Sequence, residues 1–426
     1  MYCGYIRNMC YNYSVDGINI VKKVNIWWFE NTFRFKVKNR EEYIAKALED
    51  NKLVKVFSGA RRVGKTSIIY SLINHYLDLN TKPKNIIYIT GDIKEVQTIS
   101  LRDTILTLIE KISDKNEGVH IFIDEIQEIQ NWQEDLKFLS DNFSIHFIVS
   151  GSSTSLLSKK TSKLTGRFEF IRVLPLSLKE FCLFKDYSVN KINKLHVLDE
   201  YLNTGGYPDI IGKFLPDYLK QIIDSTIYRD LLEDYGIRQP SVLEDILKIL
   251  ADKITLTVTP YQISKILRQD NEKIYNYLKY LEAVFVIYPI HGNMRSNIGT
   301  LSIPPKYYFN DTGILTAFNF RVRYGHLAEN AVFIHLLRKQ FLHERYNLFY
   351  KIINGQEYDF YDGRTLYEVK TNPNIDMKNY ELFAVDEFSR EVLDTPVIIG
   401  TDEIKENIIK NGYELKFINL FDFLYS

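Results

Sequence analysis

The sequence has few of the features that mark secreted or membrane-spanning proteins. Its three cysteines, Cys3, Cys10 and Cys182, are scattered, and their spacing fits neither a disulfide framework nor a zinc site. There is no run of about 18 apolar residues, and the amino terminus lacks the compact apolar core of a signal peptide. These absences predict a soluble protein of the reducing cytoplasm, without a membrane partner.

An excess of charge of either sign is also missing. The 54 Lys and Arg residues balance the 54 Asp and Glu residues, so the formal net charge is +0 at pH 7. Attraction of the whole chain to nucleic acid is therefore excluded, and any basic surface would have to be local. A chain of 426 residues is long enough for roughly two to four domains.

The most informative stretch is residues 59–66, which fit the phosphate-loop pattern G-x-x-x-x-G-K-[ST]. Glycines let the backbone N–H groups turn toward phosphate oxygens, Lys65 reaches the β- and γ-phosphates, and Thr66 can bind Mg²⁺. A strand at 53–57 precedes the loop, and the positive end of a helix beginning at 67 follows it. We therefore expect ATP or GTP to be bound by Gly59, Ala60, Arg61, Arg62, Val63, Gly64, Lys65, Thr66 and Ser67.

Downstream of the loop, short apolar runs alternate with helical patterns. An amphipathic helix is expected at 101–112, and runs of strand length lie at 85–90, 119–125, 144–150 and 168–173. This alternation predicts an α/β fold, the parallel sheet of a P-loop NTPase with helices on both faces and ligands at the carboxyl ends of its strands.

An acidic pair, Asp124 and Glu125, ends one of these strands. Asp124 is expected to hold Mg²⁺ from the side opposite the loop hydroxyl, and Glu125 to polarise the water that attacks the γ-phosphate. The glutamate favours hydrolysis of ATP over a GTPase of the Ras type. Ser152 or Ser153, after the neighbouring strand, is a candidate sensor of the γ-phosphate, with a turn-capping serine pair as the alternative.

These motifs, which span residues 40–185, resemble a group of prokaryotic, AAA-like ATPases abundant in archaea and bacteria. The resemblance is carried, in order, by the loop at 59–66, Asp124-Glu125-Ile126-Gln127 with Trp132, Gly151-Ser152-Ser153, Leu164-Thr165-Gly166-Arg167 and Leu174-Pro175-Leu176-Ser177. It implies a Mg²⁺-dependent ATPase, able to form a homo-oligomer, in which Arg167 is a catalytic arginine finger or sensor. That arginine would act in cis or on a neighbouring subunit, and a structural ion pair is the alternative.

Beyond residue 181 the alternation stops. Helical patterns at 194–211 and 218–232 surround the breaker cluster 205–208 and predict a helical lid, in which Arg229 is a weaker candidate for a nucleotide contact.

Residues 241–290 then have the outline of a winged helix: helix, turn, helix and strand. In such a unit the second helix would enter a major groove of DNA. The acidic residues Asp270, Glu272 and Glu282 dilute its charge, so a rigid adaptor is the alternative. The candidate phosphate contacts are Lys265, Arg268, Lys273 and Lys279.

The C-terminal part holds a second constellation. Glu329 lies on an expected helix, Asp359 on the first strand of a hairpin, and Glu368 and Lys370 on one face of the second strand. Such carboxylates can hold Mg²⁺ while Lys370 assists an attacking water. The arrangement resembles the restriction-endonuclease-like nuclease superfamily, and also the C-terminal domain of poorly defined function in the ATPase group above. Nucleic-acid binding, a scaffold or a charged strand face are the alternatives.

The expected domains are an N-terminal extension (1–35), an AAA-like P-loop ATPase domain (36–185), a helical lid (186–240), a winged-helix-like domain (241–300) and a PD-(D/E)XK nuclease-like domain (301–426). Within the extension, residues 18–28 are expected to form a strand or hairpin arm that packs on the next domain. The expected function is that of an ATP-binding and ATP-hydrolysing switch or motor that acts on DNA. The alternatives are an ATP-dependent DNA nuclease and a signalling ATPase whose C-terminal half binds a protein.

Overall fold

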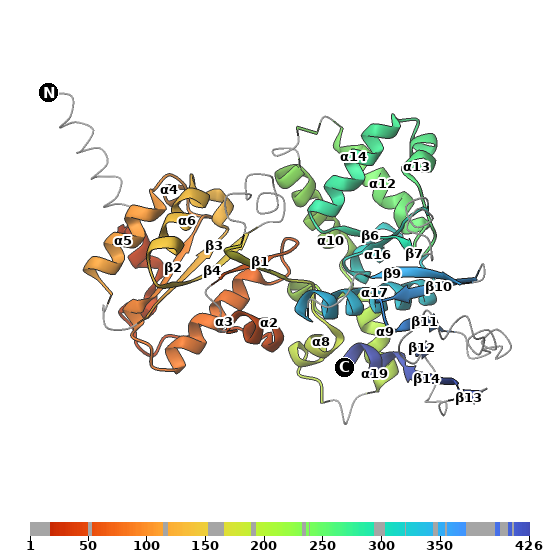
Figure 1. Cartoon of the computed structure of the whole chain (residues 1–426), viewed down its shortest axis with the longest axis horizontal. Helices are drawn as coiled ribbons and strands as arrows, with labels where there is room; N and C mark the ends of the chain where they lie inside the picture. Colours follow the sequence, from red (N-terminus) through yellow and green to blue (C-terminus); the bar gives the residue numbers. More distant parts are fainter. Residues whose placement is uncertain are drawn as a thin grey trace. The chain divides into compact units, whose positions relative to one another are not determined.

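The structure, a computed structural model, contains two compact units, residues 1–173 and 174–426 (Figure 1). It describes residues 18–49, 53–113, 118–151, 166–188, 193–231, 236–237, 239–293, 303–319, 321–343, 348–353, 356–371, 397–400, 408–410 and 413–426. Each unit has its own sheet.

The first unit is built on a five-stranded parallel sheet in the order β2-β3-β4-β1-β5. Helices α2 and α3 lie on one face of this sheet and α5 and α6 on the other (Figure 1). The strands are almost continuously buried because both faces are covered, which confirms the predicted α/β fold. The elements are α2 (Glu41–Ala47), β1 (Val54–Ser58), α3 (Lys65–Asp78), β2 (Ile86–Thr90), α4 (Lys94–Gln97), α5 (Leu101–Lys111), β3 (Val119–Asp124), α6 (Trp132–Asn142), β4 (Ile145–Gly151) and β5 (Phe168–Arg172).

Parallel pairing brings the carboxyl ends of these strands to one edge of the sheet. Ser58, the last residue of β1, pairs with Gly151 of β4 and with Arg172 of β5. Among the other strands of the sheet, Thr90, the last residue of β2, pairs with Asp124, the last residue of β3. Ligands of open parallel sheets bind beyond this edge, so the register already places the phosphate loop and the acidic pair on the ligand side.

The N-terminal segment covers the exposed edge of β2 with side chains. Asn25 acts on Tyr88 as the backbone of a neighbouring strand would, since its Oδ1 accepts the Tyr88 N–H at 2.7 Å and its Nδ2 donates to the Tyr88 carbonyl at 2.8 Å. The indole N–H groups of Trp27 and Trp28 both donate to the carbonyl of Ile86, at 3.1 and 2.9 Å. An uncovered edge strand would be open to pairing with another chain.

The expectation of a strand or hairpin arm at residues 18–28 is therefore wrong. Residues 18–24 are helical, and Ile26–Trp28 form a short 3-10 helix, η1. The edge of β2 is satisfied here by side chains and not by a paired backbone.

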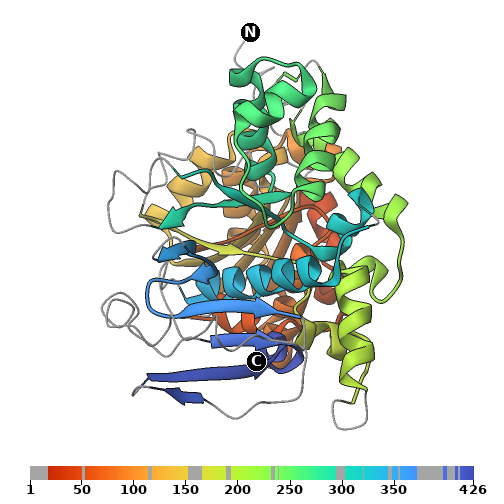
Figure 2. The ribbon, with the colours of Figure 1, turned by 90° about the vertical axis from the view of Figure 1, so that its right-hand side faces the viewer.

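The second unit contains a seven-stranded sheet in the order β13-β14-β12-β11-β10-β9-β7 and a separate antiparallel pair, β6 and β8. Figure 2 shows the long helix α17 (cyan) beside the strands of this sheet, and the aromatic rings of Tyr308, Phe333 and Phe360 join β8, α17 and β10. The strands are β6 (Ile287–Ile290), β7 (Gly292–Asn293), β8 (Lys306–Phe309), β9 (Phe349–Ile353), β10 (Gln356–Tyr361), β11 (Leu366–Lys370), β12 (Val397–Gly400), β13 (Ile408–Lys410) and β14 (Tyr413–Asn419).

Side-chain caps begin helices of this unit. A capping box of Thr259 and Gln262 begins α13, and the Asp270 side chain caps α14. Because β6 pairs with β8, hydrogen bonds cross the predicted boundary at residue 300, and the division of this half into domains stays a prediction. The α-helices are α8 (Leu178–Phe184), α9 (Lys194–Thr204), α10 (Pro216–Ser225), α12 (Pro240–Asp252), α13 (Pro260–Leu267), α14 (Asn271–Ala283), α16 (Thr312–Phe318), α17 (Tyr324–His343) and α19 (Leu420–Tyr425), and a π-helix covers Thr226–Leu231.

The breaker cluster at 205–208 has a structural role next to β8. The buried Asp311 carboxylate accepts hydrogen bonds from the backbone N–H groups of Gly206, at 2.7 Å, and Gly313, at 2.8 Å. Gly205 has φ 77°, and a Cβ there would lie 2.0 Å from an oxygen of Asp311, so a larger residue cannot occupy this position. The end of α9 is thereby fixed to the start of α16. Within the described part of the chain, no helix is long and apolar enough to cross a membrane.

Replacing Asn25 by Ala should destabilise the first unit, because the N–H and C=O groups of Tyr88 would lose their partners. We expect the free energy of unfolding to fall by about 1–3 kcal/mol. Urea unfolding followed by tryptophan fluorescence measures this, since all three tryptophans belong to the first unit. The matched control is Asn31→Ala at an exposed position, and equal midpoints for the two variants would contradict the edge-covering role.

Candidate functional site

The phosphate loop leaves β1 and closes on the start of α3. Gly64, directly before α3, has φ 96°, which a residue with a side chain rarely adopts. A Cβ on Gly59 would lie 2.3 Å from the carbonyl oxygen of Val173, so this position also requires glycine. The Lys65 amine donates to the carbonyls of Gly59 and Ala60, both at 3.0 Å. The amine is thus held inside the loop, where it could bind a phosphate.

Asp124 is joined to this loop by hydrogen bonds. Its side chain is buried, one oxygen accepts the Thr66 hydroxyl at 2.7 Å and the Tyr88 hydroxyl at 3.3 Å, and the other accepts the Ser150 hydroxyl. Burial raises the pKa of Asp124, and the donors Ser150 and Thr66 offset part of that rise. Three hydroxyl groups therefore fix the orientation of the carboxylate.

The residues Thr66 and Asp124 fit Mg²⁺. They offer a hydroxyl and a carboxylate oxygen side by side at the carboxyl edge of the sheet. Mg²⁺ prefers oxygen ligands and takes one or two of them from the protein, with phosphates and waters completing the set. A nucleotide bound in the loop would provide those phosphates.

Glu125 lies next to this pair in a strained backbone turn. Its φ of 46° is in the left-handed region, which non-glycine residues seldom occupy and which is frequent at functional sites. Its N–H donates to the Ser150 hydroxyl at 3.3 Å, and its half-buried carboxylate accepts the Gln127 amide at 2.6 Å. Ser150 therefore contacts both members of the acidic pair.

Arg167 is not brought to the phosphate loop of its own chain. It precedes β5, and its carbonyl accepts the N–H of Val54 at the start of β1, whereas the loop follows the end of β1. The five residues of β1 span about 16 Å, so the two lie at opposite edges of the sheet. The guanidinium forms an ion pair with Asp141 at 2.6 Å. This pair corresponds to the alternative of a structural ion pair, and a role of Arg167 as an arginine finger or sensor stays a prediction.

Several residues that the sequence did not indicate also support the loop. Ser150 and Tyr88 hold Asp124, and a register argument could have found Ser150, which ends a predicted strand. Arg40 is buried, donates to the carbonyl of Val63 within the loop at 2.9 Å and lies over the ring of Tyr43. An arginine before an amphipathic helix gives no such signal. The candidate sensors Ser152 and Ser153 and the side chain of Arg229 lie outside the described residues.

In the second unit, the structure brings together the residues of the second constellation. The N–H of Asp359 donates to Glu368 at 3.2 Å, Asp359 accepts the N–H of Val369 at 2.8 Å, and Lys370 pairs with Glu368 at 2.6 Å. Glu329, on α17, interacts electrostatically with Asp359 and Glu368, and both raise its pKa. The turn between the two strands forms because Asp362 accepts the N–H groups two and three residues later, and because Gly363 has φ 92°.

Residues outside the predicted set complete this group. Lys306 of β8, with a side chain 2% exposed, lies 2.6 Å from Glu357 and 3.9 Å from Glu329. The Tyr308 hydroxyl donates to Glu329 at 2.7 Å. A lysine at the start of the aromatic run Tyr307-Tyr308-Phe309 was the sequence signal that could have identified this position. We call the following residues the C-terminal cluster: Lys306, Glu329, Glu357, Asp359, Glu368 and Lys370.

Burial and mutual repulsion shift the ionisation of the cluster. Burial, followed by the charge of Asp359, raises the pKa of Glu329 well above its usual range and that of Glu368 to about 7. Burial also raises the pKa of Asp359. For Lys306, burial alone would lower the pKa, but Glu329, Asp359 and Glu357 outweigh it and the pKa is raised. The neighbouring carboxylates therefore favour the charged form of Lys306.

The C-terminal cluster does not fit a bound Mg²⁺ ion in this arrangement. Among the described residues, no group of three or more His, Cys, Asp or Glu side chains is placed to hold a metal. The carboxylates are instead engaged by an ammonium, a hydroxyl or a backbone N–H, as the contacts of Glu329, Asp359 and Glu368 show.

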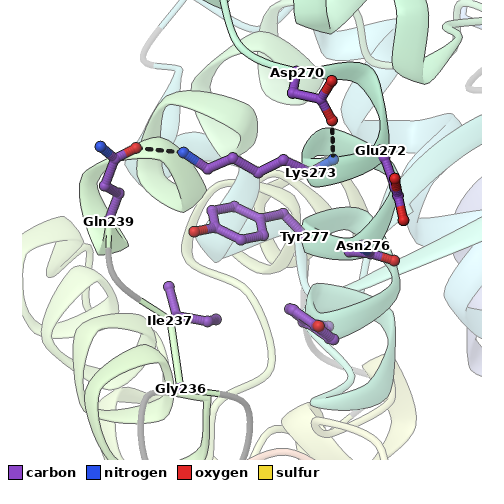
Figure 3. Close-up of a pocket in the computed structure, with 9 residues that line it drawn as sticks. Gly236, Ile237, Gln239, Asp270, Glu272, Lys273, Asn276 and Tyr277 are labelled. Atoms are coloured by element: carbon purple, nitrogen blue, oxygen red, sulfur yellow. Dashed lines mark hydrogen bonds between the residues drawn. The ribbon is translucent and has the colours of Figure 1, made fainter.

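The basic residues predicted on the winged-helix-like unit differ in their surroundings. Lys273 donates to Gln239 and, at 2.8 Å, to Gln269, and it lies in a pocket of ≈ 490 Å³ next to Tyr277 (Figure 3). Lys279 pairs with Glu282 at 2.8 Å. Lys265 and Arg268 are exposed, so these two are the better placed for a phosphate.

Two family models match the chain. A model described as an AAA domain matches residues 51–182, and one described as a domain of unknown function (DUF8612) matches residues 195–322. The first match confirms the P-loop ATPase domain. The second ends before Glu329 and leaves the restriction-endonuclease-like resemblance a prediction.

Relatives occur in an archaeon and a bacterium. A protein of Methanocaldococcus jannaschii described as uncharacterized is 31% identical over 94% of this chain and 91% of its own length. An uncharacterized protein of Haemophilus influenzae is 30% identical over 71% of this chain and 79% of its own length. A solved structure, the Thermotoga maritima RuvB Holliday junction branch migration motor, is 18% identical over 58% of this chain and 87% of that one. Its TM-score of 0.28 is too low to support a conclusion.

Gly59→Ala should abolish nucleotide binding while the protein stays folded, because the new Cβ would collide with the carbonyl of Val173 and displace the loop. Titration with a fluorescent ATP analogue measures binding, and tryptophan fluorescence checks the fold. Gly118→Ala is the matched control, since a Cβ there meets nothing within 4 Å. Undiminished binding by Gly59→Ala would show that the loop does not need this close approach.

Proposed function

We propose that this chain, which belongs to the same family as the M. jannaschii and H. influenzae proteins, binds and hydrolyses ATP as a molecular switch or motor. One observation carries the proposal, the 2.7 Å hydrogen bond between Thr66 of the loop and the buried carboxylate of Asp124. It joins a phosphate-binding element to a metal-binding one at the edge of the sheet where ligands bind.

Each residue of this site has a distinct role in the proposal. Lys65 exchanges its two carbonyl partners for the β- and γ-phosphates, and the N–H groups of the loop hold the remaining phosphate oxygens. Thr66 and Asp124 would hold Mg²⁺, which when bound neutralises phosphate charge. Glu125 orients and polarises the attacking water from a turn in the left-handed region. Ser150 positions both carboxylates.

Two substitutions separate binding from hydrolysis. Lys65→Ala should remove ATP binding and turnover together, because the loop loses its cation. Glu125→Gln should bind ATP as the wild type does but hydrolyse it about 10²- to 10⁴-fold more slowly, since only the water-polarising group is lost. Steady-state phosphate release and nucleotide titration measure the two effects. Glu128→Gln, at an exposed carboxylate three residues away, is the control, and normal turnover by Lys65→Ala would end the assignment.

The proposal extends to DNA as the target of the switch or motor. The support is the sequence α13, turn, α14 and strand β6, with the exposed cations Lys265 and Arg268 beside the turn. Phosphate contacts need exposed cations and no particular sequence. The neutral chain as a whole gives no attraction of its own, so the contact would depend on this local surface.

We expect duplex DNA to stimulate the ATPase activity of the full chain. The double variant Lys265→Ala/Arg268→Ala should weaken DNA binding and reduce the salt slope of log K by about one for each phosphate that is no longer neutralised. Lys248→Ala removes an exposed cation that pairs with Asp245 on α12 and serves as the control. ATP turnover that is independent of DNA would favour the signalling alternative, in which the second unit binds a protein.

A second candidate function, cleavage of DNA at the C-terminal cluster, is favoured by the convergence of Asp359, the buried Glu368 and the partly exposed Lys370. Metal-assisted cleavage requires a divalent cation among those carboxylates. Lys306 already brings an ammonium to the neighbouring carboxylates Glu357 and Glu329.

A further inference from the structure

The cation inside the C-terminal cluster belongs to the protein. Lys306 has a side chain that is 2% exposed, and its ammonium lies 2.6 Å from Glu357 and 3.9 Å from Glu329. The ammonium also interacts electrostatically with Asp359. An ammonium this deeply buried is stable only among carboxylates, so its location is fixed by the charges around it.

The ammonium cannot easily leave this position. All four residues of β8 are buried, and β8 is paired along its length with β6. The ammonium also lies 5.3 Å from the centre of the Tyr350 ring, and the hydroxyl of Tyr350 donates to the carbonyl of Pro304 at 2.7 Å. Strand pairing and the Tyr350 ring therefore hold the Lys306 side chain in place, and its ammonium reaches outward only as far as Glu357, whose side chain is 45% exposed.

The remaining carboxylates have protein partners as well. Glu329 accepts the Tyr308 hydroxyl at 2.7 Å, Asp359 accepts the Val369 N–H at 2.8 Å, and Glu368 is held by Lys370 at 2.6 Å. A divalent cation would have to displace these donors and would be repelled by Lys306, with the low dielectric of a buried site strengthening that repulsion.

We infer that the Lys306 ammonium takes the place of a divalent cation in the C-terminal cluster, and that the second unit therefore does not cleave nucleic acid by metal-assisted hydrolysis. The cluster is then an internal charge network that ties β8, α17, β10 and β11 together. Lys370 and Glu357, with side chains 41% and 45% exposed, are the members that can meet a ligand from solution. The inference does not depend on ATP hydrolysis by the first unit.

Removing the Lys306 charge should create a metal site. We expect Lys306→Met in the full chain to gain one Mn²⁺ site, on the order of tenfold or more tighter than any site of the wild type. Electron paramagnetic resonance of Mn²⁺ without nucleotide measures this. Lys306→Arg keeps a cation at the same position, and Lys370→Met removes only the partly exposed one, so neither control should gain the site. A folded Lys306→Met variant without a new site would overturn the inference.

The wild-type protein provides a test that does not depend on the folding of Lys306→Met. Mn²⁺ binding by the wild type should be unchanged by Asp359→Asn, and plasmid DNA should remain intact with Mg²⁺ or Mn²⁺. Wild-type Mn²⁺ binding that Asp359→Asn removes, or plasmid cleavage that Glu368→Gln removes, would show that a metal does enter the cluster.

Discussion

The first unit depends on one hydrogen bond, between the Thr66 hydroxyl and the buried carboxylate of Asp124. It joins residues 58 positions apart, and it forms because β1 and β3 run parallel and end at the same edge of the sheet. The loop also requires glycine at position 59, because a Cβ there would lie 2.3 Å from the carbonyl oxygen of Val173. Without strands that end at the same edge, the phosphate loop and the Asp124 carboxylate would not meet.

The N-terminal segment protects the same sheet and reaches toward the same carboxylate. Asn25 and two tryptophans cover the edge of β2. Within that strand, Tyr88 has its backbone held by Asn25 and its hydroxyl directed to Asp124. Tyr88 thus takes part both in the covered edge of β2 and in the orientation of the Asp124 carboxylate, so the segment from residue 18 onward packs on the sheet of the first unit.

The two acidic sites of the chain differ in what neutralises them. At Asp124 the neighbouring cation, Lys65, is held by two carbonyl groups and can move to a phosphate. In the C-terminal cluster, Lys306 is fixed in a buried strand and bonded to the carboxylates themselves. The Lys65 amine therefore contacts carbonyl groups, whereas the Lys306 ammonium is paired with carboxylates.

The sequence by itself determined the phosphate loop, the acidic pair and the α/β fold, because each depends on local backbone geometry or on the period of apolar residues. It also indicated Glu329, Asp359, Glu368 and Lys370 as a group. Only the tertiary structure placed Arg167 at the far edge of the sheet, gave Asp124 its hydroxyl donors and put Lys306 among the carboxylates. Those positions depend on which strands pair and in what register. Interactions of that kind join distant residues, and no local pattern encodes them.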